Sequence, residues 1–167
     1  MAGSRSTVRN TLARLLLLSG LALHSLTAGA LDTSLPAAID LRAESEQAGR
    51  QNGPLIILFS RRDCKYCETV RRDYLLPLTT SAGYRNRVVV RQINQDSDAV
   101  LINFRGETTT HARFANSEKI KLVPVVAFYG RNGKQLAEPI IGTRLPDFYQ
   151  GYLDDAIEKS ASALRGR

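Results

Sequence analysis

The chain of 167 residues has 43% hydrophobic and 23% charged residues, a formal net charge of +7 and two cysteines. This length predicts a single domain, and the composition argues against both a disordered chain and a multi-pass membrane protein. Basic residues occur as short pairs, Arg61-Arg62 and Arg71-Arg72, without the aromatic-rich basic stripe of nucleic-acid-binding proteins, so we expect no nucleic acid as a partner.

The first thirty residues have the pattern of a targeting segment. Three arginines and no acid precede the apolar run 15–23. The small-x-small sequence Ala-Gly-Ala follows at 28–30. The run is too short for a comfortable transmembrane helix. We therefore expect a secretory signal peptide over residues 1–30, with an uncleaved anchor as the alternative. The remaining domain, 31–167, is expected in the periplasm or outside the cell, with a formal charge of only +4.

The first elements alternate between helix and strand patterns. Residues 37–53 have helix-forming composition and end on Asn-Gly, a stop signal. Residues 54–60, PLIILFS, form a continuous apolar run typical of a strand that is buried on both faces of a parallel sheet. Apolar spacing then predicts a helix that begins near Cys64 and stops by Pro77.

The second half of the chain adds three strands and two helices. We first expect a buried strand at 87–94, a short apolar run at 99–104 and a threonine-capped helix at 108–120. A strand at 123–130 and an edge strand with Pro139 at 135–142 should follow, joined by a hairpin turn at Asn132-Gly133. The last element should be an amphipathic helix at 146–164, whose apolar stripe consists of Tyr149, Tyr152, Leu153, Ala156 and Ile157. This order predicts an α/β domain with a mixed sheet between helices.

Four chemical roles compete for Cys64 and Cys67. A zinc site needs about four ligands, but residues 31–167 contain no other cysteine and a single histidine, His111. Covalent haem attachment needs a histidine after the second cysteine, where Glu68 stands. A structural disulfide would close a very small loop and stabilise little. A redox dithiol remains, and we expect no metal and no cofactor.

The position of the cysteine pair predicts a division of labour. A cysteine at a helix N-terminus faces unpaired N–H groups and the positive end of the helix dipole, which favour the nucleophilic thiolate. A second thiol one turn further on is placed to attack a mixed disulfide formed by the first. We therefore expect Cys64 to be the exposed nucleophile and Cys67 to be the more buried resolving thiol. Tyr66, between them, is expected to be exposed, either as a contact for partner proteins or as a plain surface aromatic.

Two stretches, PLIILFSRRDCKYCETV and KLVPVVAFYGRNGKQLAEPIIGTRLPDFYQGYL, resemble a thioredoxin-fold protein. They are most similar to the exported, periplasmic thioredoxin-like group typified by SoxW, over roughly residues 37–164. The resemblance implies a thioredoxin fold, with a central mixed β-sheet flanked by helices on both faces. It also implies that Pro124 is a cis-proline beside the dithiol and that the backbone of Val123 pairs with extended substrate.

The chain departs from thioredoxins at two positions near the dithiol. Thioredoxins have a buried acid where this chain has Leu58, and a tryptophan where it has Asp63. The charge of Asp63 should raise the pKa of the nucleophilic thiol, whereas nearby cations should lower it. These cations are Arg61, Arg62 and Lys65. We expect the cations and the helix dipole to outweigh Asp63, so that the pKa of the Cys64 thiol is lowered.

The dithiol and the resemblance together predict an exported thiol–disulfide oxidoreductase that reduces or exchanges disulfides in client proteins. The sequence has no flavin or nicotinamide motif, so electrons must pass through a partner protein, and we expect a membrane thiol transporter. Two alternatives remain, which are a thiol oxidant or disulfide isomerase and a non-catalytic binding or chaperone module. Residues 99–110 form either a lip near the dithiol or a peripheral insertion. Arg71 and Arg72 are expected on a solvated face, with docking of an acidic partner as the alternative. His111 is expected to have no chemical role.

Overall fold

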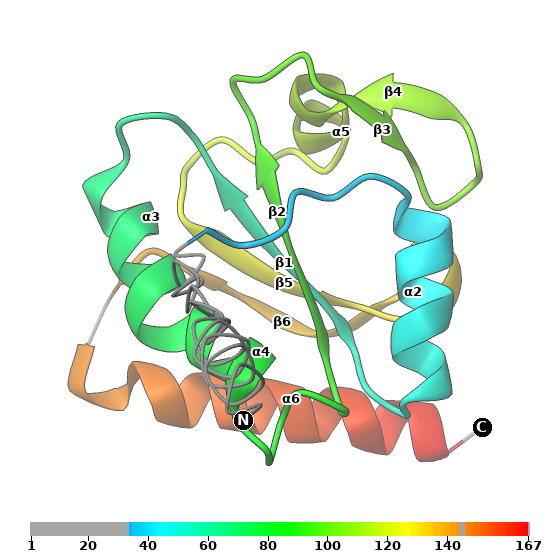
Figure 1. The fold of residues 1–167 in the computed structure, drawn as a ribbon, viewed down its shortest axis with the longest axis vertical. Helices are drawn as coiled ribbons and strands as arrows, with labels where there is room; N and C mark the ends of the chain where they lie inside the picture. The colour runs from blue at the N-terminus through cyan, green and yellow to red at the C-terminus, as the bar shows by residue number, and fades with distance from the viewer. Residues whose placement is uncertain (1–33, 144–145, 167) are drawn as a thin grey trace, which may run out of the picture. The chain divides into compact units, whose positions relative to one another are not determined.

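The computed structural model of the chain describes residues 34–143 and 146–166, so the predicted signal peptide lies outside the described residues. A four-stranded sheet forms the centre of the domain (Figure 1). Its strands stand in the order β2 (Val89–Asn94), β1 (Leu55–Ser60), β5 (Val125–Tyr129) and β6 (Gln135–Ile141). The β1–β2 pair is parallel, and the other two pairs are antiparallel. The predicted mixed sheet is confirmed, and β6 lies at its edge as Pro139 indicated.

Helices cover both faces of this sheet (Figure 1). In chain order they are α2 (Leu41–Arg50), α3 (Lys65–Thr69), the π-helical segment η1 (Val70–Leu75), α4 (Leu76–Thr80), α5 (His111–Ser117) and α6 (Tyr149–Arg165). All six residues of β1 are buried, because alternate side chains enter different cores. Ile56 and Leu58 pack with side chains of η1, α4 and α6, whereas Ile57 and Phe59 pack with side chains of α2 and α5.

Helix α2 is shorter than the predicted segment 37–53 at both ends. Asp40 is its N-cap and accepts a hydrogen bond from the N–H of Ala43 at 2.9 Å. In the segment before it, Ala37 forms a parallel bridge to Gln92 of β2. The helix-forming composition of this lead-in is therefore overridden by pairing with the sheet.

The sequence predicted that the helix after Cys64 stops by Pro77, but the helix continues past this residue. It continues through η1 into α4, where Pro77 lies in the first turn. A proline is tolerated there because its missing N–H would have no partner within the helix. In the π segment, the N–H of Leu76 bonds to the carbonyl of Arg71, five residues back. The change of register lets one continuous helical stretch accommodate the proline.

Residues 99–110 form a small second sheet, where the sequence predicted a short apolar run and the start of a helix. Strand β3 (Val100–Ile102) pairs antiparallel with β4 (Thr108–Thr110). The predicted helix at 108–120 therefore begins three residues late. Its threonine cap is confirmed, since the hydroxyl of Thr110 accepts a hydrogen bond from the N–H of Arg113 at 3.3 Å.

The C-terminal elements follow the sequence pattern closely. The turn between β5 and β6 includes the short 3-10 helix η2 (Arg131–Gly133), where Asn132 and Gly133 have positive φ angles of 59° and 73°. A 3-10 turn, η3 (Pro146–Phe148), precedes α6. Four members of the predicted stripe are buried, but Tyr152 is 49% exposed and does not belong to the core.

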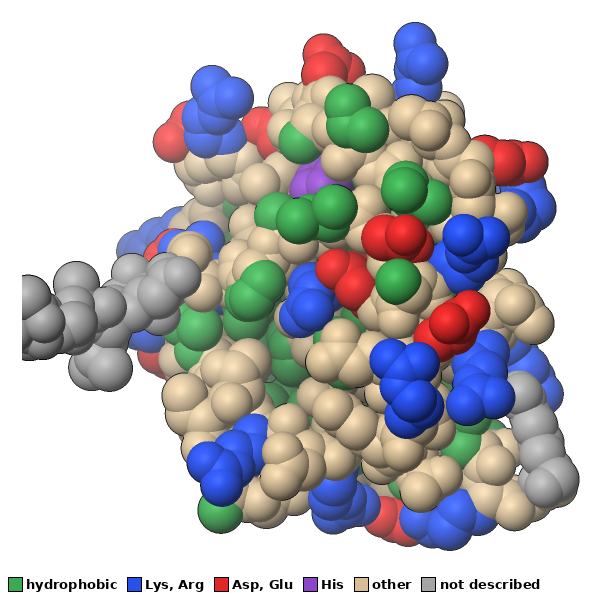
Figure 2. Space-filling model, turned by 45° about the vertical axis from the view of Figure 1, so that its right-hand side comes forward, with side chains coloured by type: hydrophobic (Ala, Val, Ile, Leu, Met, Phe, Trp, Pro, Cys, Tyr) green, Lys and Arg blue, Asp and Glu red, His purple; other side chains and the backbone are tan. Residues whose placement is uncertain are grey.

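Charged side chains are spread over the surface in mixed order. On the face drawn in Figure 2, basic and acidic side chains lie close to one another, and hydrophobic side chains appear as small separate groups.

Candidate active site

The two cysteines lie at the start of α3, joined as a disulfide with their Cα atoms 5.2 Å apart. Cys64 is the N-cap of the helix, and its Sγ accepts a hydrogen bond from the N–H of Cys67 at 3.2 Å. Cys64 is half-buried, whereas Cys67 is only 2% exposed. The order of exposure is therefore the one that a nucleophile at position 64 and a resolving thiol at position 67 require.

A short loop connects β1 to this helix and is fastened to the end of β2. The N–H of Arg62 donates to a carboxylate oxygen of Asp96 at 3.0 Å, and the N–H of Gln95 donates to the carbonyl of Ser60 at 2.8 Å. Asp63 has a positive φ of 55°, a conformation that few residues other than glycine adopt and that aspartate tolerates better than most. These contacts place the disulfide beyond the carboxyl end of β1.

Val123 and Pro124 lie at the same end of the sheet as the cysteines, where β1 ends and β5 begins. The peptide bond between them is cis. The next residue, Val125, pairs with Phe59 in the antiparallel β1–β5 ladder, which brings the start of β5 to the end of β1. Gly142, which has a positive φ of 74°, donates its N–H to the carbonyl of Pro124 at 2.9 Å. Gly142 thus forms a backbone turn beside the cis-proline.

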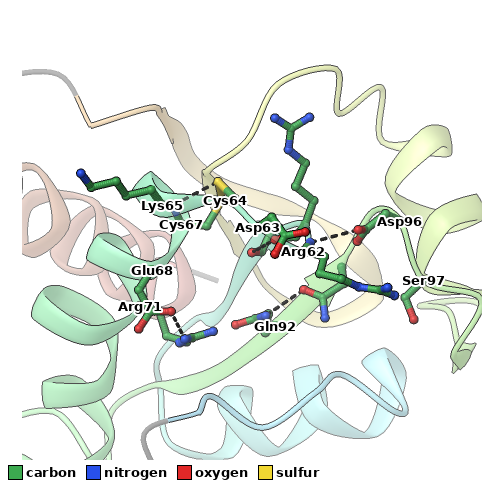
Figure 3. Close-up of a pocket in the computed structure, with 13 residues that line it drawn as sticks. Arg62, Asp63, Cys64, Lys65, Cys67, Glu68, Arg71, Gln92, Asp96 and Ser97 are labelled. Carbon is green, nitrogen blue, oxygen red and sulfur yellow. Dashed lines mark hydrogen bonds and ion pairs between the residues drawn. A yellow bond between two sulfur atoms is a disulfide. The ribbon is translucent and has the colours of Figure 1, made fainter.

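A cleft of about 620 Å³ opens on the other side of the disulfide, between the loop, α3, η1 and the end of β2 (Figure 3). Both cysteines line it together with polar and charged side chains. Those side chains are Ser60, Arg61, Arg62, Asp63, Lys65, Glu68, Arg71, Gln92, Asn94, Asp96 and Ser97. No described residue of 99–110 lines the cleft, so this segment is peripheral to it.

A model of the thioredoxin-like domain family matches residues 41–157, which is more than half of the chain. The chain belongs to the thioredoxin-like domain family. The family match and the mixed sheet confirm the predicted thioredoxin fold, but they do not distinguish the SoxW-type group within it.

Several solved structures are similar to this thioredoxin-like domain. A thioredoxin h of poplar is 17% identical, with 71% of this chain and 95% of that chain covered and a TM-score of 0.46. Mitochondrial thioredoxin 3 of Saccharomyces cerevisiae in its oxidised form is 20% identical, with 72% and 93% covered and a TM-score of 0.46. A thioredoxin-fold protein of Helicobacter pylori is 12% identical, with 68% and 83% covered and a TM-score of 0.46. No curated protein sequence is found to match the chain.

In this thioredoxin-like domain, Leu58 is completely buried beneath the dithiol side of the sheet and faces Gln92 in the parallel ladder. It belongs to the hydrophobic core and offers no proton acceptor to Cys67. Glu68 lines the cleft, but its carboxylate is engaged by the guanidinium of Arg71. The buried acid of thioredoxins therefore has no direct substitute at position 58.

The side chains expected to tune the thiols are all on the surface of the thioredoxin-like domain. Arg61, Arg62, Asp63 and Lys65 are exposed and line the cleft, whereas Tyr66 is 64% exposed and does not line it. None of the four charged side chains forms an ion pair with another described residue. Their charges are thus available to the dithiol and to any ligand.

Several lining residues were missed or misjudged from the sequence, among them Arg71 and Gln92. Arg71 was expected on a solvated face, but its side chain is 24% exposed and turns into the cleft. Arg72 is exposed as expected, and its hydrogen bond holds the pKa of Asp73 below the usual value. Gln92 gave no sequence signal, because its place beside the cysteines depends on the pairing of β2 with β1.

Among residues 34–143 and 146–166, no group of three or more His, Cys, Asp or Glu side chains is placed to hold a metal ion. Within the same residues, none of the helices has the length and apolar character needed to cross a membrane.

Proposed function

We propose that the chain is an exported thiol–disulfide oxidoreductase that reduces or exchanges disulfides in client proteins. The observation that carries this proposal is the arrangement of the cysteine pair. Cys64 is accessible at the N-terminus of α3, and Cys67 is buried one turn further into the helix. A C-x-x-C-spaced disulfide in a thioredoxin-like domain supports the same chemistry.

The reaction begins with the reduced pair. The thiolate of Cys64 attacks one sulfur of a client disulfide, which forms a mixed disulfide and releases the other client sulfur as a thiolate. Cys67 then loses its proton and attacks the sulfur of Cys64, so that the intramolecular disulfide forms and the second client sulfur leaves. The two electrons lost by the cysteine pair are gained by two client sulfurs, which become thiols after protonation.

Client binding would use the edge that carries Val123 and Pro124. An extended client segment beside Val123 would lie next to the disulfide, because β5 begins where β1 ends. Proline has no N–H group, so position 124 cannot donate to a neighbouring strand. Each turnover oxidises the pair, and a thiol donor must reduce it again. We propose a membrane thiol transporter as this donor and the periplasm as the compartment, because the N-terminal segment has the pattern of a secretory signal.

A trapping experiment tests the assignment of the two cysteines. In the Cys67→Ser variant, the mixed disulfide cannot be resolved, so client proteins should remain covalently linked to Cys64 and be released by dithiothreitol. In the Cys64→Ser variant, the buried thiol should trap almost none. Equal trapping by both variants would contradict the assigned roles, and trapping by neither would favour a non-catalytic binding module.

The direction of electron flow is tested separately by the reduction potential of the pair. Equilibration with glutathione buffers, followed by alkylation and mass measurement, gives this potential directly. A reduction potential of about −270 mV supports a reductant, whereas a potential of about −120 mV supports a thiol oxidant.

A further inference from the structure

The cleft beside the disulfide lies on the side of the dithiol opposite to the cis-proline. It is bounded by the end of β2, and β2 and β5 flank β1 on different sides. Neither Val123 nor Pro124 is among the described residues that line it. A client segment that follows Val123 therefore leaves this cleft open for another part of the same client.

The cleft has a formal excess of one positive charge, because four basic and three acidic side chains line it. Arg61, Arg62 and Lys65 line it and form no ion pair with a described residue. Of the three acids, Glu68 pairs with the guanidinium of Arg71, whereas Asp96 accepts the neutral backbone N–H of Arg62 and keeps its charge. The electrostatic potential of the cleft therefore favours an anionic ligand.

The floor of the cleft has unused hydrogen-bonding capacity. The side chains of Arg71 and Gln92 point toward one another there (Figure 3). Arg71 donates to Glu68 through Nη2, and its buried Nε has no partner among the described residues. The side-chain amide of Gln92 donates to Asn94 at 2.8 Å, and its buried Oε1 also has no partner there. An acceptor oxygen cannot bind an ionised carboxylate, so only the donors of Arg71 support an anionic ligand. A guanidinium has five donors in a planar fork, which match the two oxygens of a carboxylate.

We propose that this cleft binds a carboxylate side chain of the client, so that the chain acts preferentially on peptide disulfides with an acidic residue close to the target cystine. The inference rests on the proposed oxidoreductase function and adds a substrate class to it. A volume of about 620 Å³ accommodates a ligand of a few residues. Cys64 and Cys67 both line the cleft, so a bound carboxylate would lie close to the reacting sulfurs. The acidic residue of the client would therefore be only a few positions from the target cystine in its sequence.

Three synthetic cystine peptides test the proposal. They are identical except for one position beside the cystine, which carries Asp, Asn or Lys. The purified chain is reduced and mixed with each peptide, the reaction is quenched with an alkylating agent, and the rate of oxidation is measured by mass. We expect the Asp peptide to react about tenfold faster than the Lys peptide at low salt, with the Asn peptide between them, and the ratio to approach one in 1 M salt.

Matched variants locate the preference. In the triple variant Arg61→Gln, Arg62→Gln and Lys65→Gln, the ratio of the Asp rate to the Lys rate should fall toward one. The ratio is informative because any change in the reactivity of Cys64 affects both peptides equally. Arg62→Gln alone is the second variant should the triple variant not fold, and it should lower the ratio partially. Arg113→Gln, an exposed residue of α5 outside the cleft, should preserve the ratio.

The outcomes separate this proposal from the proposed function. Oxidation of the native chain by all three peptides at similar rates, or a ratio unchanged in the cleft variants, would overturn carboxylate recognition and leave the oxidoreductase intact. Failure of every peptide to oxidise a chain with two free thiols would overturn both.

Discussion

The backbone N–H of Cys67 donates a hydrogen bond to Sγ of Cys64, 3.2 Å away, across the first turn of α3. This N–H group is one of those at a helix N-terminus that have no partner within the helix. In the reduced chain the same geometry would direct it at a thiolate. Hydrogen bonds to the charged form of a group favour that form, so the turn itself promotes reactivity of Cys64.

The reactivity of Cys64 should therefore persist to lower pH than that of free cysteine, whose pKa is about 8.5. The measurement is the rate of alkylation of the reduced chain by iodoacetamide as a function of pH. Asp63→Asn should shift the midpoint to lower pH by removing a negative charge, and Lys65→Gln should shift it to higher pH. A midpoint of the native chain at or above that of free cysteine would show that Asp63 outweighs the cations and the helix N-terminus.

His111 should matter for stability and not for chemistry. Its Nδ1 accepts from the N–H of Asn94 at 3.1 Å, and its Nε2 lies 2.9 Å from the carbonyl of Ala38, so the ring joins β2 to the segment before α2. His111→Ala should lower the free energy of unfolding by about 2–4 kcal/mol in urea denaturation, because both backbone groups lose a buried partner. Arg113→Ala, on the exposed side of the same helix, is the control. Slower oxidation by cystine peptides in a folded His111→Ala variant would contradict the prediction.

The hydroxyl of Tyr149 is buried and has no hydrogen-bond partner among the described residues. We expect Tyr149→Phe to raise the free energy of unfolding by about 1 kcal/mol at pH 7, because the buried hydroxyl loses contact with water without replacement. Tyr152→Phe, on the exposed side of α6, should change it little. A lower unfolding free energy in Tyr149→Phe would show that the hydroxyl has a favourable interaction.

The same tyrosine gives the stability a predictable dependence on alkaline pH. Burial, and then the nearby Tyr74, raise the pKa of Tyr149, and burial likewise raises the pKa of Tyr129. Above the unfolded-state pKa of about 10, the unfolded chain loses these protons while the folded chain retains them. The contribution of these two tyrosines to the free energy of unfolding should therefore be constant below that pH and fall above it. Tyr149→Phe should reduce the fall, which urea denaturation between about pH 8 and 11 would measure.

Export predicts a specific N-terminus. When the full chain is expressed in a bacterium with a periplasm, the product should lie in the periplasmic fraction and begin at Leu31. N-terminal sequencing and the intact mass measure this directly. Leu17→Arg, in the apolar core of the segment, should block processing and leave the full-length chain. A native product that retains Met1 in the membrane fraction would instead support an uncleaved anchor.

Local sequence patterns were sufficient to predict several elements of the fold. The apolar run before Cys64 became the central strand, Asn132-Gly133 became a turn, and Thr110 became a helix cap. These predictions hold because strand burial, positive φ angles and capping depend on a few neighbouring residues. The C-x-x-C spacing and its place after a strand likewise identified the cysteine pair and the order of exposure of the two sulfurs.

The tertiary structure alone decided which distant residues meet. Nothing local to Ala37 showed that its segment pairs with Gln92, and the composition around Pro77 did not reveal the π register that carries the helix past it. The cleft needed β2 to pair parallel with β1, since only that register brings Gln92 to Arg71 and the disulfide. Backbone hydrogen bonds between strands are formed by N–H and C=O groups that nearly every residue carries. A sequence therefore indicates where a strand forms more clearly than it indicates which other strand pairs with it.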